Sequence, residues 1–125
     1  MRALPVALLA LVLAACGPSL ATRYETGNQA LSQGDGAMYF VVISPILRDA
    51  LNACIPQGTP GASPTLVVVA DVDADGHARN LEVRPRSPGT DCLREHLARR
   101  PLPRPPLAPA AATFPIGLRI NTALQ

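Results

Sequence analysis

The segment from Thr65 to Arg84, TLVVVADVDADGHARNLEVR, constrains the fold of this chain more than any other part of the sequence. Residues 66–69 form an unbroken apolar run. Leu81 and Val83 alternate with polar residues, and this period-two alternation is typical of a strand with one solvent-exposed face. Between these runs, residues 74–77 have the composition of a tight turn, because Gly76 accepts a positive φ and an aspartate tolerates the turn conformation. The segment therefore predicts a β-hairpin.

The same segment also satisfies the pattern of a calcium-binding loop, D-x-[DN]-x-[DN]-G-x5-E. Its carboxylates are Asp71, Asp73, Asp75 and Glu82. In an EF-hand such a loop lies between two helices, whereas strand patterns flank it here, so the sequence favours a hairpin with a solvated acidic turn. A calcium- or ligand-binding site on the acidic hairpin is the alternative.

The acidic hairpin does not have the pattern expected of a catalytic centre. Catalysis by carboxylates requires separated pKa values, or a base held beside a nucleophile in a cleft. The three aspartates and His77 would share the solvent at the tip of a hairpin, and Ser63 and Ser87 have no paired histidine and aspartate to activate them. We therefore expect no enzymatic activity and assign no catalytic residues.

The N-terminus has the pattern of a bacterial export signal. Met1 and Arg2 are followed by an apolar run over residues 3–13, which is too short for a permanent transmembrane helix and suits a signal peptide. Residues 13–16, Leu-Ala-Ala-Cys, then resemble the lipobox of bacterial lipoproteins, in which the cysteine thiol carries the lipid. The resemblance implies a signal peptide over residues 1–15 and a lipid on Cys16. The alternative is an ordinary cleavage site after small residues that stands beside a cysteine.

A lipid on Cys16 would anchor the mature chain at the periplasmic face of the cell envelope. Gly17 is not the aspartate that retains enteric lipoproteins at the inner membrane, so the outer membrane is favoured. Residues 16–36 are small, polar and interrupted by glycine, and they predict a lipidated N-terminus and flexible tether, with a short helix over residues 23–32 as the alternative. Residues 37–125 then form the single domain.

The composition indicates neither a strongly charged partner nor a nucleic acid. Eleven Lys and Arg residues against nine Asp and Glu residues give a formal net charge of +2. The chain has no tryptophan, two tyrosines and two phenylalanines, so the aromatic platforms on which single-stranded nucleic acids stack are missing. Apart from the covalent lipid, we expect no cofactor.

Two cysteines remain if Cys16 carries the lipid, and in an oxidising compartment Cys54 and Cys92 predict one disulfide. A metal pair or a redox couple is the alternative use of these residues. Neither fits well, because the chain has no CxxC motif and only two histidines to complete a metal site.

Two helices are predicted in the domain. Ser44 and Pro45 have the residue types of an N-cap and the first helical position, so a helix is expected over residues 45–55, where Pro56 ends it. Residues 38–43 are open between an earlier helical turn and a strand. A second, shorter helix is expected over residues 92–100, with Thr90 or Asp91 as its N-cap.

A third strand is predicted near the C-terminus, where apolar and other residues alternate over residues 114–121. Pro115 lacks an N–H group, which indicates that this strand lies at a sheet edge. The predicted fold is therefore α+β, with a small antiparallel sheet made of the hairpin and the C-terminal strand, packed against two helices and closed by one disulfide.

The order of these elements resembles the C-terminal domain of the TonB energy transducers, and more closely its cysteine-pair variant in myxobacterial gliding-motility and related envelope proteins. The resemblance covers about residues 36–121. The positions that carry it are Cys54, Val68 to Val72, Gly76, Leu81, Val83, Cys92, Leu102-Pro103 and Phe114-Pro115.

The resemblance implies a module that recognises another envelope protein, in which a strand of the partner pairs with an exposed sheet edge. The implied docking residues lie on the third strand and are Ile116, Leu118, Arg119 and Ile120. We therefore expect a non-enzymatic envelope lipoprotein with a periplasmic protein-interaction domain. The alternatives are the calcium- or ligand-binding lipoprotein described above and a purely structural lipoprotein.

Overall fold

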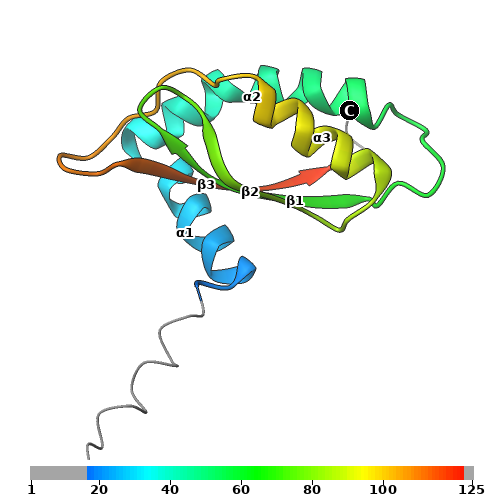
Figure 1. Ribbon diagram of the computed structural model, residues 1–125, viewed down its shortest axis with the longest axis horizontal. Helices are drawn as coiled ribbons and strands as arrows, with labels where there is room; N and C mark the ends of the chain where they lie inside the picture. Colours follow the sequence, from blue (N-terminus) through cyan, green and yellow to red (C-terminus); the bar gives the residue numbers. More distant parts are fainter. Residues whose placement is uncertain (1–16, 123–125) are drawn as a thin grey trace, which may run out of the picture.

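The computed structural model of the chain describes residues 17–122, which form three helices and one three-stranded antiparallel sheet (Figure 1). The predicted α+β class is confirmed, and so are the three predicted strands. The predicted signal peptide, residues 1–15, and the predicted lipidation of Cys16 lie outside the described residues. In chain order the elements are α1 (Leu20–Ser32), α2 (Gly34–Cys54), β1 (Thr65–Asp73), β2 (Ala78–Arg84), α3 (Pro88–Arg99) and β3 (Thr113–Asn121).

The predicted hairpin is formed by β1 and β2, with residues 74–77 as the turn. Gly76 has a φ of 92° and donates its N–H to the carbonyl oxygen of Asp73 at 2.9 Å. The carbonyl oxygen of His77 accepts from the N–H of Asp73 at 3.0 Å. The ladder shifts register between Val69 and Asp71, and Asn80, opposite this irregularity, has a φ of 52°.

Strand β3 pairs with β1 along its whole length, from Thr65 opposite Asn121 to Asp73 opposite Thr113. The strand order is β2-β1-β3, so β3 is an edge strand, as Pro115 predicted.

Helices α2 and α3 cover one face of the sheet, and α1 lies against the other (Figure 1). Alternate β1 side chains, among them Val68 and Val72, face the α2 and α3 layer and are fully buried with Ile43. Val69 is also fully buried, but it points to the opposite face, beneath α1. The largest apolar core therefore lies between the sheet and the α2 and α3 layer.

Helix α2 begins at Gly34, so the start predicted at Pro45 is wrong and residues 38–43 are helical. The buried side chains Tyr39, Ile43 and Leu47 continue one helical face across the proline. An interior proline removes one backbone hydrogen bond, and burial of this face outweighs that loss. Ser44 does not cap a helix here, because its hydroxyl donates to the carbonyl oxygen of Phe40 at 2.6 Å.

Helix α2 is the one helix of the described residues that is long and apolar enough to cross a membrane, judged by length and composition alone. In this structure its buried residues pack in the core of the domain.

Residues 20–32 form helix α1, so the alternative of a short helix over residues 23–32 is confirmed in place of a flexible tether there. The sheet is therefore covered by three helices instead of the predicted two. Ser19 caps the helix by accepting the N–H of Thr22 at 3.2 Å. Leu31 is 5% exposed and belongs to the main core. The apolar stripe of α1 is thin, but Gly27 allows the helix backbone to lie directly against β3.

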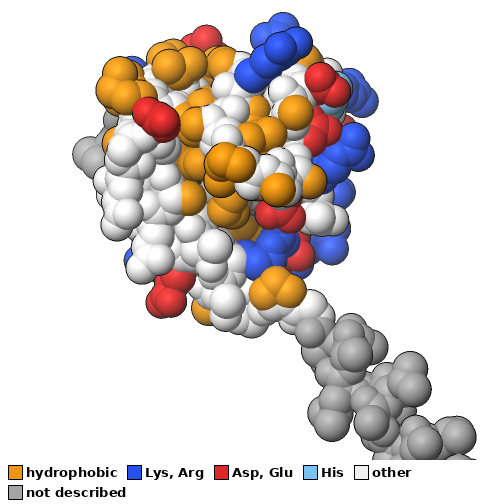
Figure 2. All heavy atoms as spheres, turned by 90° about the vertical axis from the view of Figure 1, so that its left-hand side faces the viewer, with side chains coloured by type: hydrophobic (Ala, Val, Ile, Leu, Met, Phe, Trp, Pro, Cys, Tyr) orange, Lys and Arg blue, Asp and Glu red, His pale blue; other side chains and the backbone are white. Residues whose placement is uncertain are grey.

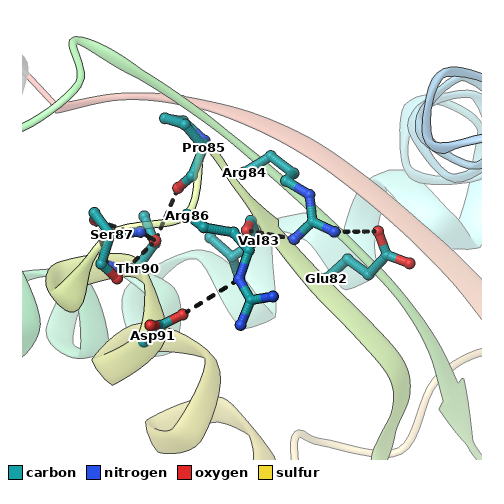
Figure 3. A network of polar contacts seen from close by, with 8 residues as sticks. All are labelled: Glu82, Val83, Arg84, Pro85, Arg86, Ser87, Thr90 and Asp91. Atoms are coloured by element: carbon teal, nitrogen blue, oxygen red, sulfur yellow. Dashed lines mark hydrogen bonds and ion pairs between the residues drawn. The ribbon is translucent and has the colours of Figure 1, made fainter.

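Helix α3 begins at Pro88, earlier than the predicted start at Cys92, and its N-cap is Ser87 in place of the predicted Thr90 or Asp91. Ser87 and Thr90 form a capping box, and the Thr90 hydroxyl also donates to the carbonyl oxygen of Pro85 at 2.8 Å (Figure 3). Thr90 is only 2% exposed, so these bonds satisfy a buried hydroxyl.

The predicted disulfide between Cys54 and Cys92 is confirmed, with the two Cα atoms 5.5 Å apart. It joins the last turn of α2 to the first half of α3. The two helices that cover the main core are therefore linked covalently.

Candidate functional site

The side of β3 that faces away from β1 carries no strand among residues 17–122. The N–H of Thr122 donates to the carbonyl oxygen of Pro64 at 3.0 Å, so the backbone of residue 122 points toward the β1 side. Backbone groups alternate in direction along an antiparallel strand. The N–H and C=O groups of Leu118 therefore point toward β1, and those of Gly117 and Arg119 point to the open side.

Part of this open side is already occupied in the first half of the strand, as far as its middle residue, Gly117. Asn28 of α1 donates its side-chain amide to the carbonyl oxygen of Gly117 at 3.5 Å, a long hydrogen bond. The corner between α1 and α2 lies nearby, because a Cβ atom at Gly36 would come within 3.2 Å of the Phe114 ring. The accessible stretch of the edge is therefore its C-terminal half, from Arg119 onward.

A groove of about 370 Å³ runs between this half of β3 and helix α2. Leu47, Leu51 and Ile120 give it apolar walls, and Phe40 stands at its side with 41% of its surface exposed. The remaining lining residues are Ser44, Arg48, Leu118, Arg119 and Asn121. An extended backbone laid beside β3 would meet the outward-pointing N–H and C=O groups of Arg119 on one side and this apolar wall on the other.

Arg48 and Arg119 are the charged residues at the groove, and no Asp or Glu of residues 17–122 lines it. The Arg119 guanidinium lies 4.9 Å from the centre of the Tyr24 ring of α1, a cation–π contact. Neither arginine takes part in the ion pairs found among residues 17–122. Arg84, in contrast, pairs with Glu82 at 3.5 Å (Figure 3).

The four docking residues predicted on β3 do not share one environment. Ile116 is 2% exposed and Leu118 is 6% exposed, so both side chains belong to the core, and Leu118 also lines the groove. Their burial follows from the strand alternation, which directs even-numbered side chains of β3 toward α2. Arg119 is exposed on the α1 side, and Ile120 is half-buried and lines the groove.

Sequence reasoning missed a group of exposed apolar side chains on α2, Met38, Val41 and Val42, because the start of this helix was placed too late. Their spacing of three and four residues is itself a helical signal. Figure 2, which views the side of the molecule where α1 meets α2, shows apolar side chains over the middle and top of this face and most charged side chains along its right-hand border.

The carboxylate of Asp73 at the acidic hairpin is fully engaged by neighbouring groups. Its Oδ1 accepts the backbone N–H groups of Asp75 at 3.0 Å and His77 at 2.9 Å, and its Oδ2 accepts Nε of Arg79 at 2.9 Å. Burial alone would raise the pKa of Asp73, but the bonds from His77, Arg79 and Asp75 outweigh it and lower the pKa.

The other carboxylates of the calcium pattern are divided by the hairpin geometry. Atoms of Asp73, Asp75 and His77 that could bind a metal lie within 4.8 Å of one another. Asp71 and Glu82 instead face Arg23 of α1, at 3.8 Å and 3.4 Å. Strands flank this loop where an EF-hand has helices. Asp73 thus stabilises the turn of the hairpin through hydrogen bonds. Asp71 and Glu82 bind the hairpin to α1 through ion pairs with Arg23.

The proline-rich segment after α3 packs against the hairpin turn and α2. Leu102 is 5% exposed and donates its N–H to the carbonyl oxygen of Gly76 at 2.8 Å. The hydroxyl of Tyr39 donates to the carbonyl oxygen of Pro103 at 2.8 Å, and burial raises the pKa of Tyr39 to about 12. The segment is therefore part of the fold and holds the turn in place.

No protein-family model, curated protein or solved structure matches this chain.

Proposed function

We propose that this chain is a non-enzymatic envelope lipoprotein whose domain binds another envelope protein by accepting one of its strands at the edge of β3. The observation that carries the proposal is the open C-terminal half of β3 beside the groove of about 370 Å³. An exposed sheet edge offers backbone donors and acceptors, and an apolar wall next to it offers side-chain selectivity.

The proposal includes a TonB C-terminal-domain-like fold and a lipid on Cys16 that anchors the protein at the periplasmic face of the envelope, with the outer membrane favoured. The order of a helix ending in Cys54, a hairpin, a helix containing Cys92, a proline-rich segment and a closing strand supports the first part. The lipobox-like residues 13–16 and the disulfide, which suits an oxidising compartment, support the second.

The start of α1 supports a short link between the proposed anchor and the domain. Helix α1 begins at Leu20, so only residues 17–19 separate it from Cys16. Three residues span at most about 10 Å. The proposed partner is therefore a protein that reaches within a few nanometres of the anchoring membrane.

Photo-crosslinking in intact cells tests the proposal. A photo-crosslinking amino acid replaces Ser44 in the groove, and the control variant carries it at Glu95, an exposed residue of α3. We expect one discrete envelope protein in the adduct from position 44 and not from position 95. Lipid adducts, adducts with the same protein, or no adduct from position 44 in a folded protein would contradict docking at this edge.

A further inference from the structure

We infer that the strand accepted by β3 is acidic as well as apolar, and that Arg48 and Arg119 select it by charge. This inference rests on the proposed function and specifies the chemistry of the partner. It uses the two arginines that line the groove.

The position of a docked strand follows from the sheet geometry. A strand added beside β3 would lie about 5 Å from it, with successive side chains directed to opposite faces of the sheet. On the α2 face, those side chains meet Leu47, Leu51 and the guanidinium of Arg48. On the α1 face, they meet Arg119, whose guanidinium lies over the Tyr24 ring. Each face of the docked strand thus encounters apolar or aromatic surface together with one cation.

Within residues 17–122, the two cations differ from the other arginines of the sheet and α1 in having no carboxylate partner. Arg23, Arg79 and Arg84 each lie within 4 Å of a carboxylate. Arg48 and Arg119 take part in no such pair among residues 17–122. A carboxylate on the incoming strand would gain a charge-assisted hydrogen bond to a guanidinium, and a lysine there would be repelled.

The same charges disfavour a second copy of this chain as the occupant. A second copy could pair its β3 with this β3 around a two-fold axis at residue 119. Arg119 would then lie opposite Arg119 of the other copy, and the two Arg48 side chains would lie at the same interface. Like charges directly opposite each other destabilise a strand pair. The edge is therefore protected against self-association and remains available to an acidic strand.

Fluorescence anisotropy with the mature, detergent-solubilised lipoprotein tests the inference. The probes are short labelled peptides of alternating valine and glutamate, valine and lysine, or valine and serine. We expect the glutamate peptide to bind about tenfold more tightly than the serine peptide and the lysine peptide to bind most weakly, with the difference reduced by salt. Arg48→Glu and Arg119→Glu should each weaken binding of the glutamate peptide about tenfold, and the double variant should prefer the lysine peptide.

The control variant Arg94→Glu changes an exposed arginine of α3 and should leave all three affinities unchanged. Thermal unfolding of each variant shows that the domain is intact.

Equal binding of the three peptides would overturn the charge selection while leaving edge docking in place. If no peptide binds but crosslinking at position 44 still gives one discrete adduct, only the charge inference is overturned. If no peptide binds and crosslinking gives no such adduct, the proposed function is overturned as well. Concentration-dependent dimers whose formation Arg119→Glu abolishes would identify a second copy as the occupant and contradict the inference.

Discussion

Gly27 of α1 and Gly117 of β3 are in direct backbone contact, because a Cβ atom at Gly27 would lie 2.2 Å from the nitrogen of Gly117. The contact is reciprocal, since a Cβ atom at Gly117 would lie 2.3 Å from the carbonyl oxygen of Tyr24 in α1. This close approach fixes α1 on the outer face of the sheet. The groove lies on the other face, between β3 and α2.

Replacing Gly27 with alanine should destabilise the domain. Real Cβ atoms do not approach a backbone atom to 2.2 Å, so the strand or the helix must move. Overpacking of this kind costs about 1–3 kcal/mol, which exceeds the gain from replacing glycine by alanine in a helix. Urea unfolding measures the loss. Gly17→Ala is the matched control, because nothing lies within 4 Å of the added atom. Equal stability of the two variants would mean that α1 does not pack on β3 as described.

Loss of the disulfide should lower the free energy of unfolding. Cys54 and Cys92 are separated by 38 positions, and closing a loop of that length in the unfolded chain is worth at most about 4 kcal/mol. The double variant Cys54→Ser, Cys92→Ser should therefore unfold at a markedly lower urea concentration than the oxidised protein. Alkylation of the unreduced protein provides the direct check, and labelling of both cysteines would contradict the pairing.

Much of the fold could be predicted from local patterns, and the errors have identifiable causes. The hairpin, the third strand and its edge position follow from alternation, turn residues and Pro115. A Ser-Pro pair is a helix-start signal, and the chain has three of them, of which Ser63-Pro64 directly precedes β1 instead of a helix. At Ser87 it starts a helix, whereas at Ser44 it lies within α2, because the core face continues from Tyr39 through the proline.

Helix α1 and the groove were harder to anticipate because both depend on contacts far apart in sequence. The segment over residues 20–32 has few apolar residues, and its docking depends on Gly27 meeting Gly117 across 90 positions. Arg119 was identified as a docking residue, but Arg48 was not, because only the folded chain brings α2 beside β3.

Tyr39→Phe should reduce stability by about 1 kcal/mol, the typical net contribution of one hydrogen bond. The variant removes the bond to the carbonyl oxygen of Pro103, which is 2.8 Å long, and leaves that oxygen without this partner. The edge-on contact of the ring with Phe114 is kept. Urea unfolding at neutral pH measures the change, and a variant as stable as the wild type would contradict the role of this bond.

The titration of Tyr39 provides a separate test of its burial. The chain has two tyrosines, so Tyr24→Phe leaves Tyr39 as the only phenol. Its ionisation, followed by ultraviolet absorption, should be centred near pH 12 in the folded protein. The unfolded phenol ionises near pH 10, so stability should fall as the pH rises between these two values. Ionisation near pH 10 without unfolding would show that Tyr39 is accessible.

The contacts of Asp73 should contribute to an acid-dependent loss of stability. The pKa of Asp73 is lowered in the folded protein, so the unfolded chain binds the proton more readily. Stability from this carboxylate is therefore present above about pH 4, the usual value for aspartate, and is lost as the pH falls through the lower folded value. Unfolding midpoints over this range should fall less steeply in Asp73→Asn than in the wild type.

Asp49→Asn is the control for this measurement, because Asp49 is exposed on α2 and makes no ion pair among the described residues. It should keep the acid-dependent fall of the wild type, since the contacts of Asp73 remain. Identical pH profiles for wild type and Asp73→Asn would show that the hairpin carboxylate does not stabilise the turn.

Amide hydrogen exchange along β3, measured with and without the crosslinked partner or the valine–glutamate peptide, tests strand docking most directly. The N–H of Arg119 points to the open side, and that of Leu118 points toward β1. We expect binding to slow exchange at Arg119 by about tenfold or more, with a much smaller change at Leu118, which is already bonded within the sheet. Binding that leaves exchange at Arg119 unchanged would contradict strand addition at this edge.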